Sequence, residues 1–195
     1  MATATTIADR LSAGGEAATG AAADIEVDIT VACSGWEHAL PDLHGTCRAA
    51  VLAALAAVQT NTARAEISLV LADDAFVRDL NRRYRDIDRP TNVLAFCGDE
   101  ADADADDDAG DDAGAGRTGP PRLLGDVIVA HETARAEAQA ENKSLAAHLC
   151  HLIVHGVLHL LGHDHQNDEE AETMEALEVE ALAAMGIDNP YAEST

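Results

Sequence analysis

The feature that most constrains this chain is a run of histidines near its C-terminus. Residues 151–165 read H-L-I-V-H-G-V-L-H-L-L-G-H-D-H. On a helix, His155 and His159 lie on the same face one turn apart, because they are separated by four positions. Gly162 can adopt a positive φ, end the helix and turn the chain back, which returns His165 to the same place. The segment therefore predicts a helix, a glycine turn and three convergent imidazoles.

Three convergent imidazoles predict a metal site, and the ion they favour is zinc. Neutral imidazole binds Zn²⁺ at about 2.0–2.1 Å, and three protein ligands leave a fourth position open, which is typical of catalytic zinc. We therefore predict one Zn²⁺ per chain on His155, His159 and His165, at the catalytic centre. The neighbouring His151 is predicted to pack or hydrogen-bond rather than ligate.

The remaining histidines and one acid are weaker candidates. His163 and Asp164 could each orient a ligand or a water molecule, or could equally be exposed turn residues. Four other histidines are predicted to be ordinary surface or packing residues: His38, His44, His131 and His148.

The histidine spacing is also that of metzincin proteases, H-E-x-x-H-x-x-G-x-x-H. The position after the first histidine holds Gly156 instead of glutamate. That glutamate is the general base for peptide hydrolysis. The metal ligands thus fit a metalloprotease, whereas the catalytic apparatus does not.

The rest of the chain predicts a single α+β domain with a four-stranded mixed sheet and about five helices. Period-2 or apolar runs predict four strands, at residues 25–31, 65–71, 91–96 and 123–130, the last of them central. Helical periodicity and capping residues predict helices at 42–58, from Asp73 or Asp74 to Tyr84, at 132–141, from Ser144 through the histidines, and from Asp168 to Met185. The zinc site is predicted on the C-terminal histidine helix and the turn after it.

Two of the predicted helices have an apolar face. The helix ending at Tyr84 is predicted to present Phe76, Val77, Leu80 and Tyr84 on one face. The last helix is predicted to present Met174, Leu177, Ala181, Leu182 and Met185 on one face and glutamates on the other.

Low-complexity segments bound the domain. Residues 1–23 are rich in Ala, Thr and Gly and are predicted to be a flexible leader. The domain is predicted at 24–188, followed by a tail at 189–195. Within it, residues 99–119 hold nine acids and almost no large apolar residue, which predicts a disordered loop. A calcium loop is disfavoured because the D-x-D-x-D-G-x5-E pattern is missing.

The charge balance is strongly acidic, with 36 acidic against 12 basic residues and a formal net charge of −24. Such a balance disfavours nucleic-acid binding, which usually shows a basic footprint. Five arginines nevertheless cluster within one segment: Arg78, Arg82, Arg83, Arg85 and Arg89. Their planar guanidinium groups suit phosphate. Arg82 and Arg83 are predicted to form salt bridges on a solvated helix face, and Arg85 to be functional.

Cysteine usage and hydropathy indicate a soluble cytoplasmic protein. The spacing of Cys33, Cys47, Cys97 and Cys150 suggests neither a disulfide framework nor a cysteine zinc site, which predicts free thiols in a reducing cytosol. No secretory signal and no apolar run long enough to span a membrane are found.

Three motifs resemble the bacterial YbeY family of endoribonucleases, also called rRNA maturation factors. The histidine segment resembles the family pattern H-G-x-L-H-L-x-G-[HY]-D-H. Residues 80–96 resemble L-N-x-x-Y-R-x-x-D-x-P-T-[DN]-V-L-S-F, and residues 124–128 resemble L-G-D-[IV]-x-I. His148, Leu149, Glu172, Met174 and Glu178 also fit. The resemblance covers about residues 25–186.

The resemblance implies a zinc-dependent, single-strand-specific endoribonuclease. It implies a role in maturing the 3′ end of small-subunit rRNA and in ribosome quality control, with single-stranded rRNA, the small subunit and assembly factors as partners and no membrane. It also implies zinc on His155, His159 and His165 and a functional arginine at Arg85. The alternatives are a metallohydrolase of another substrate, including a divergent peptidase, and a non-enzymatic ribosome-assembly factor with structural zinc.

Two departures from the family pattern affect the loops. Ala95 and Cys97 replace the usual serine and proline, and the acidic insertion at 99–119 is longer than expected for the family. Both bear on how RNA approaches and leave the metal ligands unaffected. The residues do not assign the general base, and the 2′-hydroxyl of RNA could serve as the nucleophile.

Overall fold

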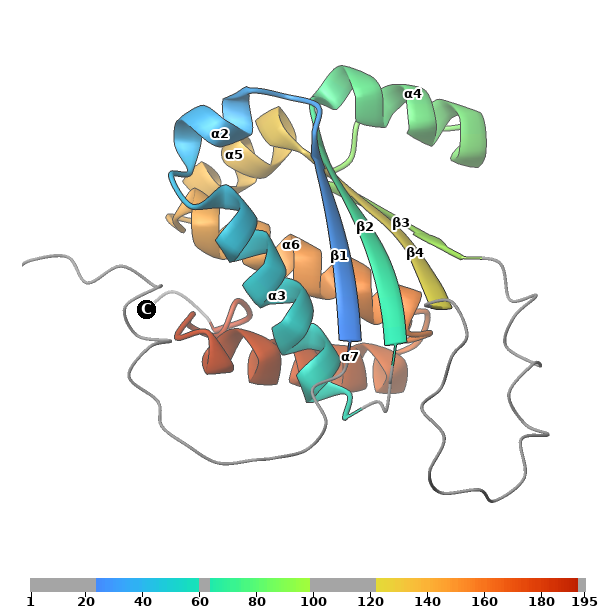
Figure 1. The fold of residues 1–195 in the computed structure, drawn as a ribbon, viewed down its shortest axis with the longest axis vertical. Coiled ribbons are helices and arrows are strands. Elements are labelled where there is room, and N and C mark those ends of the chain that lie inside the picture. The colour runs from blue at the N-terminus through green and yellow to red at the C-terminus, as the bar shows by residue number, and fades with distance from the viewer. Residues whose placement is uncertain (1–23, 60–63, 99–121, 193–195) are drawn as a thin grey trace, which may run out of the picture.

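The computed structural model describes residues 24–59, 64–98 and 122–192. The predicted leader and the acidic loop at 99–119 lie outside these ranges. The described part is one α+β domain with four strands, as the sequence predicted, and with six helices, one more than the five predicted (Figure 1). The strands are β1 (Asp24–Val31), β2 (Arg64–Ala72), β3 (Val93–Cys97) and β4 (Arg122–Ala130). The helices are α2 (Gly35–Ala39), α3 (Leu43–Ala57), α4 (Asp74–Arg85), α5 (His131–Ala140), α6 (Leu145–Leu160) and α7 (Asp168–Ala184).

The sheet is mixed, with the strand order β1-β2-β4-β3. β1, β2 and β4 are parallel, and β3 pairs with β4 in the antiparallel sense at one edge. The predicted central place of β4 is confirmed. Gly125 in β4 has φ +138°, and a Cβ atom there would lie 2.1 Å from the carbonyl oxygen of Phe96. Only glycine therefore permits this close approach of β4 to the edge strand.

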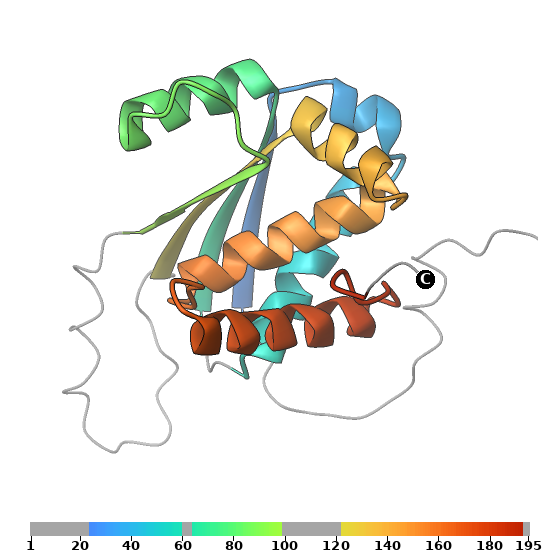
Figure 2. The same cartoon turned by 180° about the vertical axis from the view of Figure 1, so that it is seen from behind.

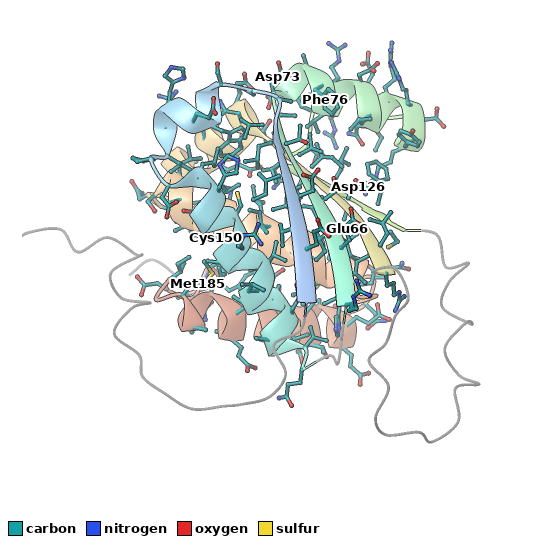
Figure 3. All side chains as sticks on the ribbon, in the orientation of Figure 1. Glu66, Asp73, Phe76, Asp126, Cys150 and Met185 are labelled. Carbon is teal, nitrogen blue, oxygen red and sulfur yellow. The ribbon has the colours of Figure 1, made fainter. Side chains whose placement is uncertain are left out.

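Helices α3, α6 and α7 cover one face of the sheet and share one core with it. Figure 2 looks onto α6 lying across the strands, with α7 beside it, whereas Figure 1 shows the strands in front of α6. A smaller apolar cluster under α4 lies on the opposite face and includes Val77, Leu94 and Ile128. That face is polar further along the strands, and Figure 3 shows Glu66 and Asp126 on the neighbouring strands β2 and β4.

Side-chain caps begin four of the helices. The capping side chains accept hydrogen bonds from the backbone N–H three residues on, at 3.3, 2.8, 3.1 and 3.0 Å for Asp42, Asp73, Ser144 and Asn167. The cap of α7 is thus Asn167, and the prediction of Asp168 was wrong by one residue. Either side chain can accept this hydrogen bond, but an N-cap residue needs a non-helical backbone. The backbone of Asn167 is extended, whereas that of Asp168 is already helical.

Helices α2 and α4 also differ from the predictions. Helix α2 has five residues and was not predicted from the sequence. It is fixed by Trp36, which is fully buried and whose Nε1–H donates to the Ala72 carbonyl at 3.2 Å. On α4, Val77 is buried, but Phe76 and Tyr84 are 46% and 69% exposed. The predicted apolar face of α4 is therefore only partly a core face.

The described helices all fall short of the length and apolar character needed to cross a bilayer. The four cysteines lie within the described residues, and all are free thiols. Burial raises the pKa of Cys47 and of Cys150 to about 12, so these two thiols stay protonated at neutral pH.

Candidate metal centre

The last two turns of α6 and the turn after it bring three histidines together. The rings of His155 and His159 have centroids 4.6 Å apart, as four-residue spacing on a helix requires. Gly162 has φ +87° and turns the chain back, so that the His165 ring lies 5.5 Å from the ring of His155 and 5.1 Å from that of His159. One ring nitrogen from each residue lies within 4.8 Å of the others.

The hydrogen bonds around these rings suit a cation. The carboxylate of Glu178 can only accept, so His155 Nδ1–H donates to it at 2.7 Å, which leaves Nε2 as the ring nitrogen that can face a metal ion. That atom lies 3.1 Å from Nε2 of His159. Burial lowers the pKa of His159, and the positive charge that His155 and His165 can carry lowers it further, which favours the neutral ring that a metal ion requires. Imidazole nitrogens that converge in this way fit a borderline divalent ion such as Zn²⁺.

Glu178 on α7 connects this cluster to the rest of the domain. Its side chain is 1% exposed and accepts hydrogen bonds from His155, from His151 Nε2 at 3.0 Å and from the hydroxyl of Tyr191. Burial alone would raise the pKa of Glu178, but these hydrogen bonds outweigh burial and lower it to about 2. A carboxylate held in this way fixes the tautomer and the orientation of a metal-binding histidine.

Sequence reasoning did not assign Glu178 this role, and it placed the glutamates of α7 on the solvent side. The sequence did hold an indication of this role: Glu178 follows Met174 by four positions and therefore lies on the apolar face of the helix. Tyr191 belongs to the segment predicted as a tail, and its hydroxyl proton is bound to Glu178. Burial and this bond raise the pKa of Tyr191.

The remaining candidates near the site have other partners. His151 points to Glu178, as the prediction of a hydrogen-bonding role requires. Asp164 accepts from the backbone N–H of His165 at 2.8 Å and from Gln166 Nε2 at 2.5 Å, so it stabilises the turn. His148 bonds Glu137 at 2.9 Å, and Glu137 also accepts from Asn92 at 3.1 Å.

Gly156 explains why no glutamate follows the first histidine. Its position is buried against β4, and a Cβ atom there would lie 2.6 Å from Cγ1 and 3.1 Å from Cγ2 of Val127. A side chain at 156 would therefore be driven into the sheet. The arrangement leaves no room for the general base of a metzincin at this position.

We expect Gly156→Ala to lower the stability by about 1–2 kcal/mol, because overpacking costs about 1–3 kcal/mol and alanine regains part of that in helix propensity. Thermal unfolding should report a Tm lower by roughly 2–8 °C. Combining it with Val127→Ala, which makes room for the new methyl group, should cost less than the sum of the two single changes. Additive losses would show that this contact does not limit the packing of α6 on β4.

The arginine cluster lies on α4 and in the loop that follows. Arg82 and Arg83 both pair with Asp79, at 2.8 and 2.5 Å, as predicted for a solvated face. Arg78 forms a two-pronged pair with Asp88, at 2.7 and 2.9 Å. Arg85 ends α4 and is exposed, with no ion pair or side-chain hydrogen bond to any residue in the described ranges.

The end of α4 and the histidine cluster meet at the edge strand β3. The rings of Tyr84 and Phe96 have centroids 5.2 Å apart, and the next residue, Cys97, directs its thiol at the His159 carbonyl at 3.7 Å. Figures 1 and 2 both show the C-terminal ends of α4 and α6 on the side of the domain bordered by β3. Arg85, at the end of α4, is thus on the same side as the metal ligands.

Comparison with known proteins agrees with these motifs. A sequence model of the family "Endoribonuclease YbeY" matches residues 36–186. The endoribonuclease YbeY of Paramagnetospirillum magneticum is 52% identical over 170 residues, which are 87% of this chain and 97% of that protein. That of Azorhizobium caulinodans is 48% identical over 169 residues, which are 86% of this chain and 97% of that protein. Among solved structures, the solution structure of TM1509 from Thermotoga maritima has a TM-score of 0.45 and 19% identity, covering 86% of this chain and 99% of that one. The family match and the identities over most of both chains show that this chain belongs to the YbeY endoribonuclease family.

Proposed function

We propose that the protein is a zinc-dependent endoribonuclease that cuts single-stranded rRNA, with one catalytic zinc ion on His155, His159 and His165. The observation that carries the proposal is the three-histidine cluster with its convergent ring nitrogens. Family membership supports the choice of RNA. The proposed role is maturation of the 3′ end of small-subunit rRNA and ribosome quality control in the cytoplasm. Its proposed partners are the small subunit and its assembly factors.

The roles of the residues follow from their positions. When bound, zinc supplies Lewis acidity towards a phosphoryl oxygen and activates water. Glu178 holds His155 in the tautomer that leaves Nε2 free. Arg85 is proposed to bind a phosphate of the substrate, since its guanidinium is not engaged with any described side chain. The exposed ring of Tyr84 beside it offers a stacking surface for an unpaired base, which suits single-stranded RNA.

The described contacts weigh against a structural zinc site and against a peptidase. A structural zinc site is usually closed by a fourth protein ligand, yet the nearest candidates, His151 and Asp164, are turned to other partners. A peptidase needs a general base next to the first histidine, and the packing of Gly156 on Val127 excludes one. Both observations favour an open site without metzincin chemistry.

Arg85→Ala tests the proposal. We expect kcat/KM for a single-stranded RNA to fall about 10- to 100-fold, because a charge-assisted hydrogen bond is worth about 1.5–3 kcal/mol. The salt dependence of RNA binding should weaken by about one counterion. The matched control is Arg82→Ala, three residues earlier and already paired with Asp79, for which we expect a loss below about fivefold.

The outcomes separate a specific role from a general one. If the Arg85→Ala variant cleaves RNA at the wild-type rate, Arg85 has no role in the active site. Equal losses in both variants would mean that only the overall charge of α4 matters. Failure of the folded wild-type protein to cut any single-stranded RNA with its zinc bound would contradict the proposed function.

A further inference from the structure

A second group of metal-binding side chains lies at the carboxyl edge of the parallel strands. Cys33 follows β1, Asp73 and Asp74 follow β2, and His131 and Glu132 follow β4. Because the three strands are parallel, these residues meet at one edge, where α2 and the first turns of α4 and α5 gather (Figure 1). Figure 3 marks this place with Asp73. Ligands of open α/β sheets bind at such edges.

Three different ligand types converge there. The thiol of Cys33, a ring nitrogen of His131 and a carboxylate oxygen of Glu132 all lie within 4.8 Å of one another. Ligand atoms around a tetrahedral zinc ion lie about 3.5 Å apart, so the three groups need to close by only about 1 Å. Glu132 is exposed and Cys33 half-buried, so both side chains have room to make this adjustment.

His131 is buried with an unsatisfied nitrogen. It is 8% exposed, and its Nε2 has no hydrogen-bond partner among the residues that the structure describes. The ring is fixed edge-on against Trp36, with centroids 4.9 Å apart, and a Cβ atom at Gly35 would come within 2.7 Å of it. A buried polar atom without a partner costs free energy, and a metal ligand role removes that cost.

Glu132 is held in place by a reciprocal pair of contacts between α4 and α5. Its carboxylate accepts from the backbone N–H of Asp74 at 2.9 Å. Asp74 in turn accepts from the backbone N–H and the hydroxyl of Thr133, at 3.0 and 2.9 Å. This bonding leaves the second oxygen of Glu132 available. The nearby carboxylates of Asp73 and Asp74 add negative charge, which favours a cation.

We propose that Cys33, His131 and Glu132 form a second metal site, separate from the three-histidine centre and selective for zinc or a similar borderline ion. Thiolate together with imidazole favours such ions over Mg²⁺ and Ca²⁺. Water completes the coordination. Because the ligands come from the end of β1 and the start of α5, the bound ion ties the first strand to the helix after the central strand. The site depends on neither the proposed ribonuclease activity nor its metal.

Cobalt separates the two sites by spectrum, since only a thiolate ligand gives a sulfur-to-cobalt charge-transfer band in the near ultraviolet. The full chain is titrated with Co²⁺ as wild type and as His155→Ala/His159→Ala. We expect two Co²⁺ per wild-type chain and one in the double variant, with the band present in both. The Cys33→Ser variant should lose the band and bind one Co²⁺ fewer. The Glu132→Gln variant should do the same at low Co²⁺ concentration, because glutamine keeps the contact with Asp74 but lacks the negative charge of the carboxylate. The control is Cys97→Ser, which removes an exposed thiol elsewhere and should keep the band.

A wild-type protein that binds a single Co²⁺ without the band would overturn the proposal. So would a band that survives Cys33→Ser or disappears with Cys97→Ser, because the sulfur ligand would then lie elsewhere. Circular dichroism of each variant, compared with the wild type, separates loss of the site from loss of the fold.

Discussion

The double variant His155→Ala/His159→Ala is expected to bind one zinc ion fewer per chain than the wild type and to lose RNA cleavage. Removing a residue that merely supports a metal ligand costs about 10- to 100-fold in affinity or activity. Removing two of three ligands should therefore exceed about 100-fold. Metal content by mass spectrometry and cleavage of a labelled single-stranded RNA, measured on the same samples, give both numbers.

His44→Ala is a suitable control for that variant, because His44 is exposed on α3 and belongs to neither proposed metal site. It should retain both zinc and cleavage. A zinc content of the double variant equal to that of the wild type would show that the ligand set is wrong. Cleavage that survives the loss of zinc would show that the metal has no part in the reaction.

The local parts of this structure were predictable from the sequence. The strands at residues 25–31 and 65–71 were found because alternation of apolar and polar residues is a property of one segment. The histidine cluster was predictable for the same reason: three ligands and a glycine turn lie within eleven positions, at 155–165. In both cases the positions of the residues along the chain determine where their side chains lie relative to one another.

Features that depend on tertiary packing were not predictable. Helix α2 is too short to show a period and exists because Trp36 is buried under the end of β2. The apolar run of β4 predicted its central place, but no local pattern encodes which strands flank it in the order β1-β2-β4-β3. Cysteine spacing gave no hint of metal binding by Cys33, because the other two residues of the proposed second site follow a different strand.

The role of Glu178 also depends on tertiary packing and was not predicted. Replacing Glu178 by alanine should lower both the stability of the protein and its affinity for zinc. Glu178→Ala leaves the Nδ1–H of His155 and the hydroxyl of Tyr191 without their acceptor and opens a cavity in the core. Breaking a buried hydrogen-bonded pair costs about 3–5 kcal/mol; because the histidines are partly exposed, we expect about 2–4 kcal/mol. The Tm of the chelator-treated protein should fall by roughly 5–15 °C.

The same change should weaken zinc binding about 10- to 100-fold, because His155 loses the partner that fixes its tautomer. Glu178→Gln should fall between wild type and alanine, since its amide oxygen can still accept from His155 but carries no charge. Glu175→Ala, on the exposed side of α7, should match the wild type in both measurements. A competition titration with a zinc chelator gives the affinity. Unchanged affinity alongside a lowered Tm would make Glu178 a core residue without influence on the metal, whereas a joint loss ties the stability of α7 to the geometry of the three-histidine centre.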